Sequence, residues 1–271
     1  MSELHSVVCV KVVPKSEEIR VDPHTKLIIR EGVRSEINPP DMNALEMALD
    51  LRDRYGGRVS ILSMGPPYFE PILRVGLAMG ADHIYLLSDR ALGGADTLAT
   101  TYSLMRGVVK IGSVNLIFCG EESADGATGQ VPAGLAEWLD YSQLTLLTEI
   151  DVDLKLKVSR GRREIRGGYE LLEVPLPAVV SVKTACNEPR FMDFRLKPWA
   201  FEEQSAITVW DAGDLDSDPN CIGFEGSPTV VTDLAEAPTR ERKRQFLEGS
   251  QQEIVQQLAS ILQKEQLSLG S

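Results

Sequence analysis

Short apolar runs alternate with helical patterns along roughly the first 140 residues. Four runs are nearly continuous, as is typical of parallel strands buried on both faces; they cover residues 7–10, 59–62, 84–87 and 114–119. The segments between them place apolar residues three and four positions apart, as Leu45, Ala48 and Leu49 are, which predicts helices. Strands alternating with helices predict an α/β fold, a Rossmann-like parallel sheet with helices on both faces.

Several residues mark the expected ends of these elements. Asp41 and Asp96 are each expected to cap the start of a helix. Gly80 is expected to end a helix over residues 70–79, because glycine readily adopts the left-handed conformation. A short excursion strand is predicted over residues 26–30.

The pattern changes after about residue 150. A β-hairpin region is predicted, with antiparallel strands at 154–159 and 170–174 around a charged loop at 160–166. Another strand follows at 177–182. The arginines of the charged loop are interpreted as a solvated surface, with a contact to a partner or to a flavin as the alternative.

From residue 187 to about 252 the helical and strand periodicity is weak. This segment is much longer than an ordinary loop. We interpret it as a C-terminal arm that packs on another polypeptide, with Trp199 and Trp210 as interface anchors. Partial disorder is the alternative interpretation. An amphipathic helix is predicted from about residue 253.

Composition and charge exclude several classes of function. The net charge of −12 repels a phosphate backbone and argues against nucleic acid as a partner. The four cysteines form no CxxC pair and the three histidines are far apart, so no metal site is predicted. The sequence shows no nucleophile paired with a general base, so no catalytic residue is predicted. Without a signal peptide or a run of about 20 apolar residues, the chain is expected to be cytoplasmic, with no membrane insertion.

Ligands of open parallel sheets bind beyond the carboxyl ends of the strands. Two segments expected there, 93–97 and 125–131, are rich in glycine and small hydroxyl residues, and each leads into a helix. Small residues let a phosphate approach the backbone, and the N–H groups at a helix start are donors for it. Neither a GxGxxG nor a P-loop motif is present, and tight turns also need glycine. These residues alone therefore leave open both a nucleotide site and plain turns.

Three segments together resemble the electron-transfer flavoprotein β family. They are Asn38-Pro39-Pro40-Asp41 with Ala44-Leu45-Glu46-Met47-Ala48, then the run LRVGLAMGAD over 73–82, and Asn187-Glu188-Pro189-Arg190-Phe191 after an LPAVV strand. The resemblance extends over roughly residues 5–200.

The resemblance implies an adenine nucleotide in this β subunit and a further FAD on a larger α subunit, its obligate partner. The implied nucleotide contacts are Cys9, Asn38, Asp41, Met64 and Gly120, and the turn Asp125, Gly126, Ala127, Thr128, Gly129, Gln130 and Val131. A recognition loop is implied to dock an acyl-CoA dehydrogenase-type or other redox partner through Asn187, Glu188, Pro189, Arg190, Phe194 and Leu196. The chain then divides into a nucleotide-binding α/β domain, 1–185, and a recognition loop with the C-terminal arm, 186–271.

The segment 88–100 is similar to the electron-bifurcating subset of this family, in which the β nucleotide is FAD and NADH is a donor. The resemblance adds Gly94, Asp96, Thr97 and Thr100 as cofactor contacts. The chain departs from the family pattern at Ala127, at Pro132, and at Glu121 and Glu122, whose two carboxylates would oppose a pyrophosphate.

Two alternatives stay open at this point. One is a non-bifurcating electron carrier with structural AMP in the same site. The other, from a different class, is a stand-alone adenine-nucleotide-binding regulatory module. The long arm argues against the second, because a self-contained sensor needs no segment that wraps a partner.

Overall fold

The structure, a computed structural model, describes residues 3–15, 34–202, 206–230, 232 and 246–264, and the backbone of 20–21 and 28–29. The chain divides into two compact units, Met1–Leu234 and Ala235–Ser271. The predicted excursion strand over 26–30 falls mostly outside the described residues. Its centre forms β4 (Ile28–Ile29), which pairs with β3 (Arg20–Val21).

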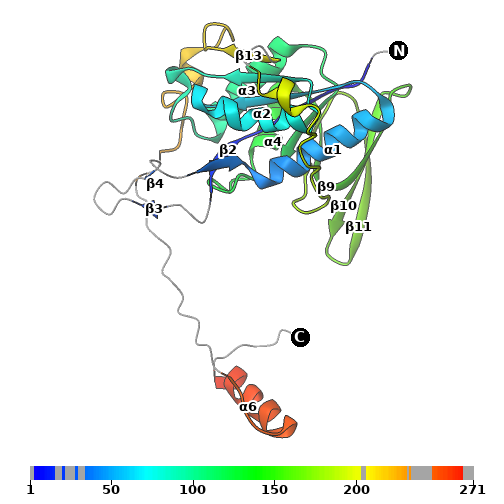
Figure 1. The fold of residues 1–271 in the computed structure, drawn as a ribbon, viewed down its shortest axis with the longest axis vertical. Coiled ribbons are helices and arrows are strands. Elements are labelled where there is room, and N and C mark those ends of the chain that lie inside the picture. Colours follow the sequence, from blue (N-terminus) through cyan, green and yellow to red (C-terminus); the bar gives the residue numbers. More distant parts are fainter. Residues whose placement is uncertain are drawn as a thin grey trace. The chain divides into compact units, whose positions relative to one another are not determined.

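A nine-stranded sheet forms the centre of the first unit (Figure 1). In spatial order the strands are β11 (Gly168–Pro175), β10 (Val158–Ile165), β9 (Ser142–Asp153), β12 (Ala178–Val182), β8 (Leu116–Gly120), β1 (His5–Cys9), β6 (Arg58–Met64), β7 (His83–Leu87) and β13 (Ile207–Trp210). All neighbouring pairs from β9 to β13 are parallel, whereas β10 is antiparallel to both of its neighbours, β9 and β11. A small antiparallel pair, β2 (Val12–Pro14) with β5 (Ser35–Ile37), lies outside this sheet.

Helices cover both faces of the sheet. Residues of α1 (Pro39–Tyr55) and α2 (Glu70–Met79) share one hydrophobic cluster with Val8 of β1. Residues of α3 (Thr97–Ile111) and α4 (Val131–Leu139) share the other cluster with Val7, the residue directly before Val8. Successive strand residues point to opposite faces, so β1 is buried on both sides. The predicted α/β fold, with a largely parallel sheet between helices, is confirmed.

Two of the three predicted helix ends are confirmed. Gly80 follows α2 in the left-handed conformation, with φ of 117°. Asp96 precedes α3 and accepts hydrogen bonds from the N–H groups of Leu98 and Ala99. The capping role predicted for Asp41 is wrong, because α1 begins at Pro39 and Asp41 lies in its first turn. Proline is preorganised for a helix start and has no N–H to cap, which leaves the Asp41 carboxylate free for other donors.

The charged run over 160–166 is not a loop, as predicted, but most of β10. Each of three arginines pairs with a glutamate on a neighbouring strand: Arg160 with Glu173, Arg162 with Glu149, and Arg163 with Glu170. Opposite charges across a pair of strands stabilise a sheet. The long strand β9 was not predicted at all; the apolar residues that it buries are Leu144, Leu147, Ile150 and Val152.

Part of the predicted arm belongs to the chain's own sheet. β13 adds a strand beside β7, with Trp210 opposite Leu87 in the register. The Trp210 ring stacks on Tyr85 with centroids 4.7 Å apart, and the amine of Lys110 lies over the indole. The Trp210 side chain therefore packs within the chain's own sheet, and its role as a subunit-interface anchor stays a prediction. The described contacts of this side chain are internal.

The second unit contains α6 (Gln251–Lys264), close to the amphipathic helix predicted from residue 253. Exposed apolar side chains accompany it, among them Phe246, Val255 and Leu258. Among the helices in the described part of the chain, none is both long and apolar enough to cross a membrane.

Candidate functional site

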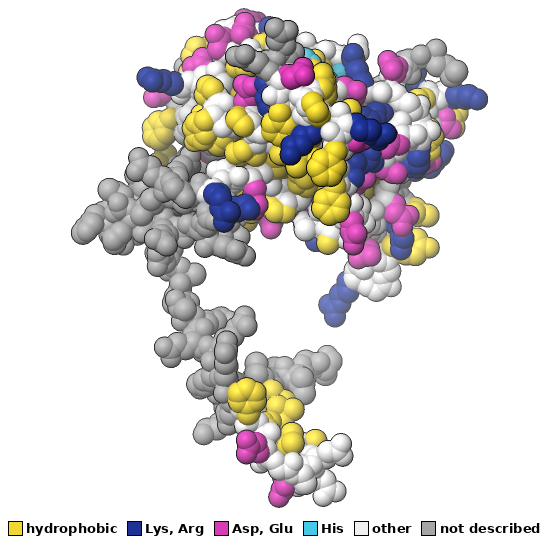
Figure 2. Space-filling view, in the orientation of Figure 1, with side chains coloured by type: hydrophobic (Ala, Val, Ile, Leu, Met, Phe, Trp, Pro, Cys, Tyr) yellow, Lys and Arg dark blue, Asp and Glu magenta, His cyan; other side chains and the backbone are white. Residues whose placement is uncertain are grey.

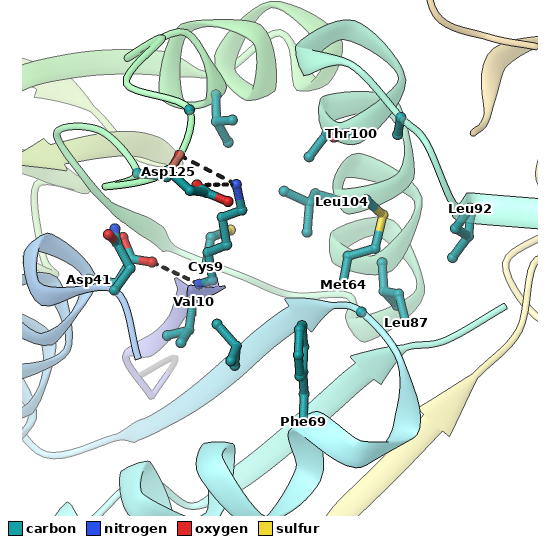
Figure 3. A pocket seen from close by; sticks show the side chains of 18 of the residues that line it. Cys9, Val10, Asp41, Met64, Phe69, Leu87, Leu92, Thr100, Leu104 and Asp125 are labelled. Atoms are coloured by element: carbon teal, nitrogen blue, oxygen red, sulfur yellow. Dashed lines mark hydrogen bonds and ion pairs between the residues drawn. The ribbon is translucent and has the colours of Figure 1, made fainter. Parts of the chain in front are cut away.

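A cavity of about 1420 Å³ opens beyond the carboxyl ends of β1, β6, β7 and β8 (Figure 3). The strand ends supply its floor, and the loops that lead into α1, α3 and α4 supply its walls. Its position is the one expected for a ligand of an open parallel sheet. The volume exceeds the range of ~300–1,000 Å³ common for small-molecule pockets.

One end of the cavity is polar and is built around Asp41. The carboxylate of this buried residue accepts hydrogen bonds from the backbone N–H of Lys11 at 2.7 Å and of Gly120 at 3.1 Å. A Cβ atom at position 120 would lie 2.5 Å from the Asp41 Oδ1 and 2.7 Å from Pro40, so only glycine allows this approach. The start of α1 is thereby joined to the ends of β1 and β8.

Burial raises the pKa of Asp41 to about 7, although the backbone N–H groups of Lys11 and Gly120 and the side chain of Asn38 favour its charged form. Loss of hydration disfavours a buried carboxylate more than these donors favour it. The group therefore titrates near neutral pH at the floor of the cavity.

Asn38 fixes the loop that follows β8. Its amide donates to the carbonyl of Glu122 at 2.9 Å, and its oxygen accepts from the N–H of Ala124 at 3.0 Å. These two bonds satisfy both ends of a buried amide. They hold residues 122–124 against the start of α1 and so shape the wall of the cavity.

Lys11 is a lining residue that the sequence did not reveal. Its ammonium lies 2.5 Å from Asp125 and 3.4 Å from the hydroxyl of Ser123 (Figure 3). Burial opposes the charged form of Asp125, but the hydrogen bond and charge of Lys11 outweigh it, so the pKa of Asp125 lies below its usual value. The sequence feature that could have identified Lys11 as a lining residue is its position two residues after Cys9, directly beyond a buried strand.

The other end of the cavity is apolar. Figure 3 shows Leu87, Leu92 and Leu104 on the opposite side from Asp41 and Asp125. Met64 and Phe69 also line this part, and Gly65 leaves room for the Phe69 ring, which a Cβ at position 65 would meet at 2.4 Å. A planar aromatic group suits such a wall of leucine, methionine and phenylalanine side chains.

The loop between β7 and α3 closes the cavity on this side. Besides capping α3, Asp96 accepts hydrogen bonds from the N–H and hydroxyl of Thr229, and its own N–H donates to the hydroxyl of Ser227. The hydroxyls of Thr97 and Thr128 lie 3.5 Å apart, between the two glycine-rich segments. The two loops that sequence reasoning selected therefore meet at one mouth.

The structure brings the expected cofactor contacts together. All of them line the cavity except Ala127 and Gln130; those that do are Cys9, Asn38, Asp41, Met64, Gly94, Asp96, Thr97, Thr100, Gly120, Asp125, Gly126, Thr128, Gly129 and Val131. Ala127 has a left-handed backbone, and Gln130 directly precedes α4. The contacts with a cofactor remain a prediction.

The two carboxylates that depart from the family pattern do not act alike. Glu121 pairs with Lys183 at 2.7 Å and accepts from the N–H of Thr184 at 3.2 Å. Burial opposes its charged form, but these partners lower the pKa of Glu121 below its usual value. Its charge is balanced within the protein. Glu122 is exposed and its backbone carbonyl binds Asn38.

The expected docking loop has a fixed base and an exposed tip. Asn187 pairs with Asn43, and Arg190 forms ion pairs with Glu46 and Asp53 of α1. By contrast, Phe194 is 85% exposed. Asn187 and Arg190 therefore anchor the base of the loop on α1, whereas Phe194 at its tip is available to a partner.

Further apolar side chains surround that tip. Leu196 is 36% exposed at the start of α5 (Lys197–Ala200), and Phe191, Met192, Trp199 and Phe201 are exposed as well. Hydrophobic side chains gather on the front of the first unit, bordered by Lys and Arg side chains (Figure 2). Exposed apolar clusters of this kind mark interaction sites. Glu188 and Pro189 belong to the same loop.

Within the described residues, no group of three or more His, Cys, Asp or Glu side chains is arranged to hold a metal ion. Cys9 and Cys119 end the adjacent strands β1 and β8 and are free, buried thiols. A hydrogen bond that the Cys119 thiol donates to Cys9, together with burial, raises the pKa of Cys119 well above its usual value. Both cysteines line the cavity.

Comparison with known proteins agrees with the geometry. A family model described as electron transfer flavoprotein domain matches residues 25–215. Protein FixA of Azotobacter vinelandii is 42% identical over 252 residues, with 91% of this chain and 89% of the relative covered. The electron transfer flavoprotein subunit beta of Thermoanaerobacterium thermosaccharolyticum is 40% identical over 260 residues, covering 96% and 98%.

A third relative is the caffeyl-CoA reductase-Etf complex subunit CarD of Acetobacterium woodii, 41% identical over 226 residues, covering 83% of this chain and 85% of the relative. Each of these matches extends over most of both chains. With the α/β sheet and the family model, they show that the chain belongs to the electron transfer flavoprotein family, among its β subunits.

Proposed function

We propose that this chain binds FAD in the cavity beyond β1, β6, β7 and β8 and acts as the β subunit of a heterodimeric electron carrier. The observation that carries the proposal is the continuity of the cavity from a polar end at Asp41 to an apolar end at Leu87, Leu92 and Phe69. AMP needs places only for adenine, ribose and one phosphate. A second, apolar compartment supports a ligand with an additional aromatic ring system.

The arrangement of polar groups is consistent with such a ligand. Asn38 and Asp41 stand at one end, the turn 125–129 and Thr97 at the mouth, and the leucine side chains at the other end. FAD placed along this path would set its adenosine near Asp41 and its isoalloxazine in the apolar compartment. The flavin would supply the redox chemistry; the protein would supply orientation, shielding from water and local charge.

We further propose that the αβ complex shuttles electrons between NADH or an acyl-CoA dehydrogenase-type partner and other redox partners, by flavin-based bifurcation. The support is the segment 88–100, which lines the cavity at Ser88, Gly94, Thr97 and Thr100. The balanced charge of Glu121 removes one of the two objections to a pyrophosphate in this site.

The test is to purify the complex with its α subunit and to count the nucleotides released on denaturation. Two FAD per heterodimer and no AMP are expected. One FAD and one AMP would overturn FAD binding in this chain and favour the non-bifurcating carrier, for which the polar end alone would suffice. A colourless, stable monomer that binds an adenine nucleotide would instead favour a regulatory module.

A further inference from the structure

The cavity is lined by more acids than bases. Among the described lining residues, the cations are Lys11 and Arg90. The acids are Asp41, Asp89, Asp96, Glu121, Glu122 and Asp125. Because like charges repel strongly where water is scarce, a phosphate entering this cavity needs a nearby cation that can turn toward it.

Lys11 has the geometry for this role. Its backbone N–H is held at 2.7 Å by the buried carboxylate of Asp41, so the root of the side chain is fixed at the cavity floor. Its ammonium is at the end of a flexible four-carbon stem and is bound to Asp125, on the glycine-rich turn. The side chains remain 47% and 23% exposed, respectively, so both reach the open cavity.

Arg90 does not meet the same conditions. It lies on the 3-10 turn Arg90–Leu92 in the loop before α3, is exposed, and has no ion pair among the described residues. No hydrogen bond in the described part of the chain links it to the turn 125–129. Lys11 is therefore the lining cation that the structure connects to the turn where a phosphate is expected.

We propose that Lys11 is the residue that makes the cavity prefer phosphorylated adenine ligands, and that Asp125 competes with the ligand phosphate for its ammonium. In this structure the ammonium is bound by Asp125. A phosphate, with its larger charge and three acceptor oxygens, displaces the carboxylate. Asp125 is then released, and its carboxylate can accept a hydrogen bond from a ribose hydroxyl. This inference rests on the proposed nucleotide site.

The test compares AMP with adenosine, which differ only in the phosphate. Nucleotide is removed from the purified αβ complex, and each compound is titrated calorimetrically. Lys11→Gln is expected to weaken AMP at least tenfold and to change adenosine less than twofold. Lys11→Arg should restore most of the preference. Asp125→Asn keeps an acceptor for ribose but removes the competing charge, so it should raise the ratio of AMP to adenosine affinity.

Arg160→Gln is the matched control, because Arg160 also forms an ion pair with a carboxylate, Glu173 at 2.6 Å, and neither residue lines the cavity. Its affinity ratio should equal that of the wild type. If Lys11→Gln weakened AMP and adenosine equally, or neither, the role of Lys11 would be overturned while the nucleotide site stood. An unchanged ratio in Asp125→Asn would refute the competition. A wild-type complex that bound neither compound would overturn the nucleotide site itself.

Discussion

Asn187 and Asn43 hold each other through hydrogen bonds in both directions. The Asn43 amide donates to the Asn187 carbonyl at 2.9 Å and to its side-chain oxygen at 2.8 Å, while the Asn187 amide donates to the Asn43 carbonyl at 3.0 Å. Asn43 is buried within α1. A helix on one face of the sheet therefore fixes the base of the loop that carries Phe194.

Removing this amide should cost stability. Asn187→Ala removes the side-chain oxygen that accepts from the buried Asn43 amide and the N–H group that donates to the Asn43 carbonyl, and an unsatisfied buried polar group costs about 1–3 kcal/mol. Urea unfolding of the αβ complex should show a loss of this size, whereas the exposed neighbour Glu188 changed to alanine should show almost none. Equal stability of the two variants would contradict the anchoring role.

The exposed tip should matter for docking and not for cofactor content. Phe194→Ala and Leu196→Ala should each slow electron transfer to an acyl-CoA dehydrogenase-type partner, because truncating an interface anchor typically costs ~2 kcal/mol or more. Stopped-flow transfer rates and bound flavin would be measured together. Leu171, an exposed apolar residue on β11, serves as control. Unchanged rates in both variants would remove the loop from docking.

Thr97 should contribute directly to flavin retention. A hydrogen bond to a charged group is worth about 1.5–3 kcal/mol, so Thr97→Ala should weaken FAD binding about tenfold or more. Thr97→Ser keeps the hydroxyl and should bind nearly as the wild type does. Flavin released during equilibrium dialysis checks both variants. If serine and alanine lost FAD equally, the Thr97 hydroxyl would have no part in binding.

Trp210 should stabilise the chain itself. Its stacking on Tyr85 attaches β13 to the sheet, and an aromatic pair adds about 0.5–1.5 kcal/mol beyond the burial of its area. Trp210→Ala should therefore lower the melting temperature clearly more than Val209→Ala, whose side chain is exposed on the same strand. Similar melting temperatures for the two variants would contradict this.

Asp41 should make stability depend on pH. Its pKa is about 7 in the folded chain and 3.8 as an ordinary value, so between these limits the folded state holds a proton that the unfolded state loses. Its stabilising contribution is complete below about pH 4 and is lost as the pH rises through 7, by up to ~1.4 kcal/mol per pH unit. The difference in unfolding free energy between the wild type and Asp41→Asn should follow this course.

His5 acts with the opposite sign over a similar range. Burial lowers its pKa from 6.5 to about 4, with the charge of Arg58 as a further cause, so its contribution is complete above pH 6.5 and is lost as the pH falls toward 4. In Asp41→Asn this dependence remains, together with that of His83, whose pKa burial also lowers, and stability should rise with pH between 4 and 6.5. A flat profile in that variant would contradict the assignment.

Sequence reasoning predicted the elements whose structure is locally determined. Four buried strands, the end of α2 at Gly80 and the cap at Asp96 follow from apolar runs and single-residue conformational preferences. It failed where contacts between residues far apart in the sequence determine the local structure. The arginines of β10 are extended because glutamates on β9 and β11 neutralise them. β13 forms because β7 offers an edge and Tyr85 a surface for Trp210.

The same distinction holds for the site. Glycine-rich turns beyond strands were visible in the sequence, and the structure places them around one cavity. Lys11 was not visible, because a lone lysine after a strand resembles any surface lysine. Its relation to Asp125 depends on two loops that are 114 residues apart in the sequence.

One carboxylate, Asp96, starts the helix at the cavity wall and also holds Thr229, just before the chain continues toward the second unit. Two tasks of the molecule thus depend on a single side chain. A substitution of Asp96 therefore has two effects at once, because it loosens both the start of α3 at the cavity wall and the attachment of the segment around Thr229.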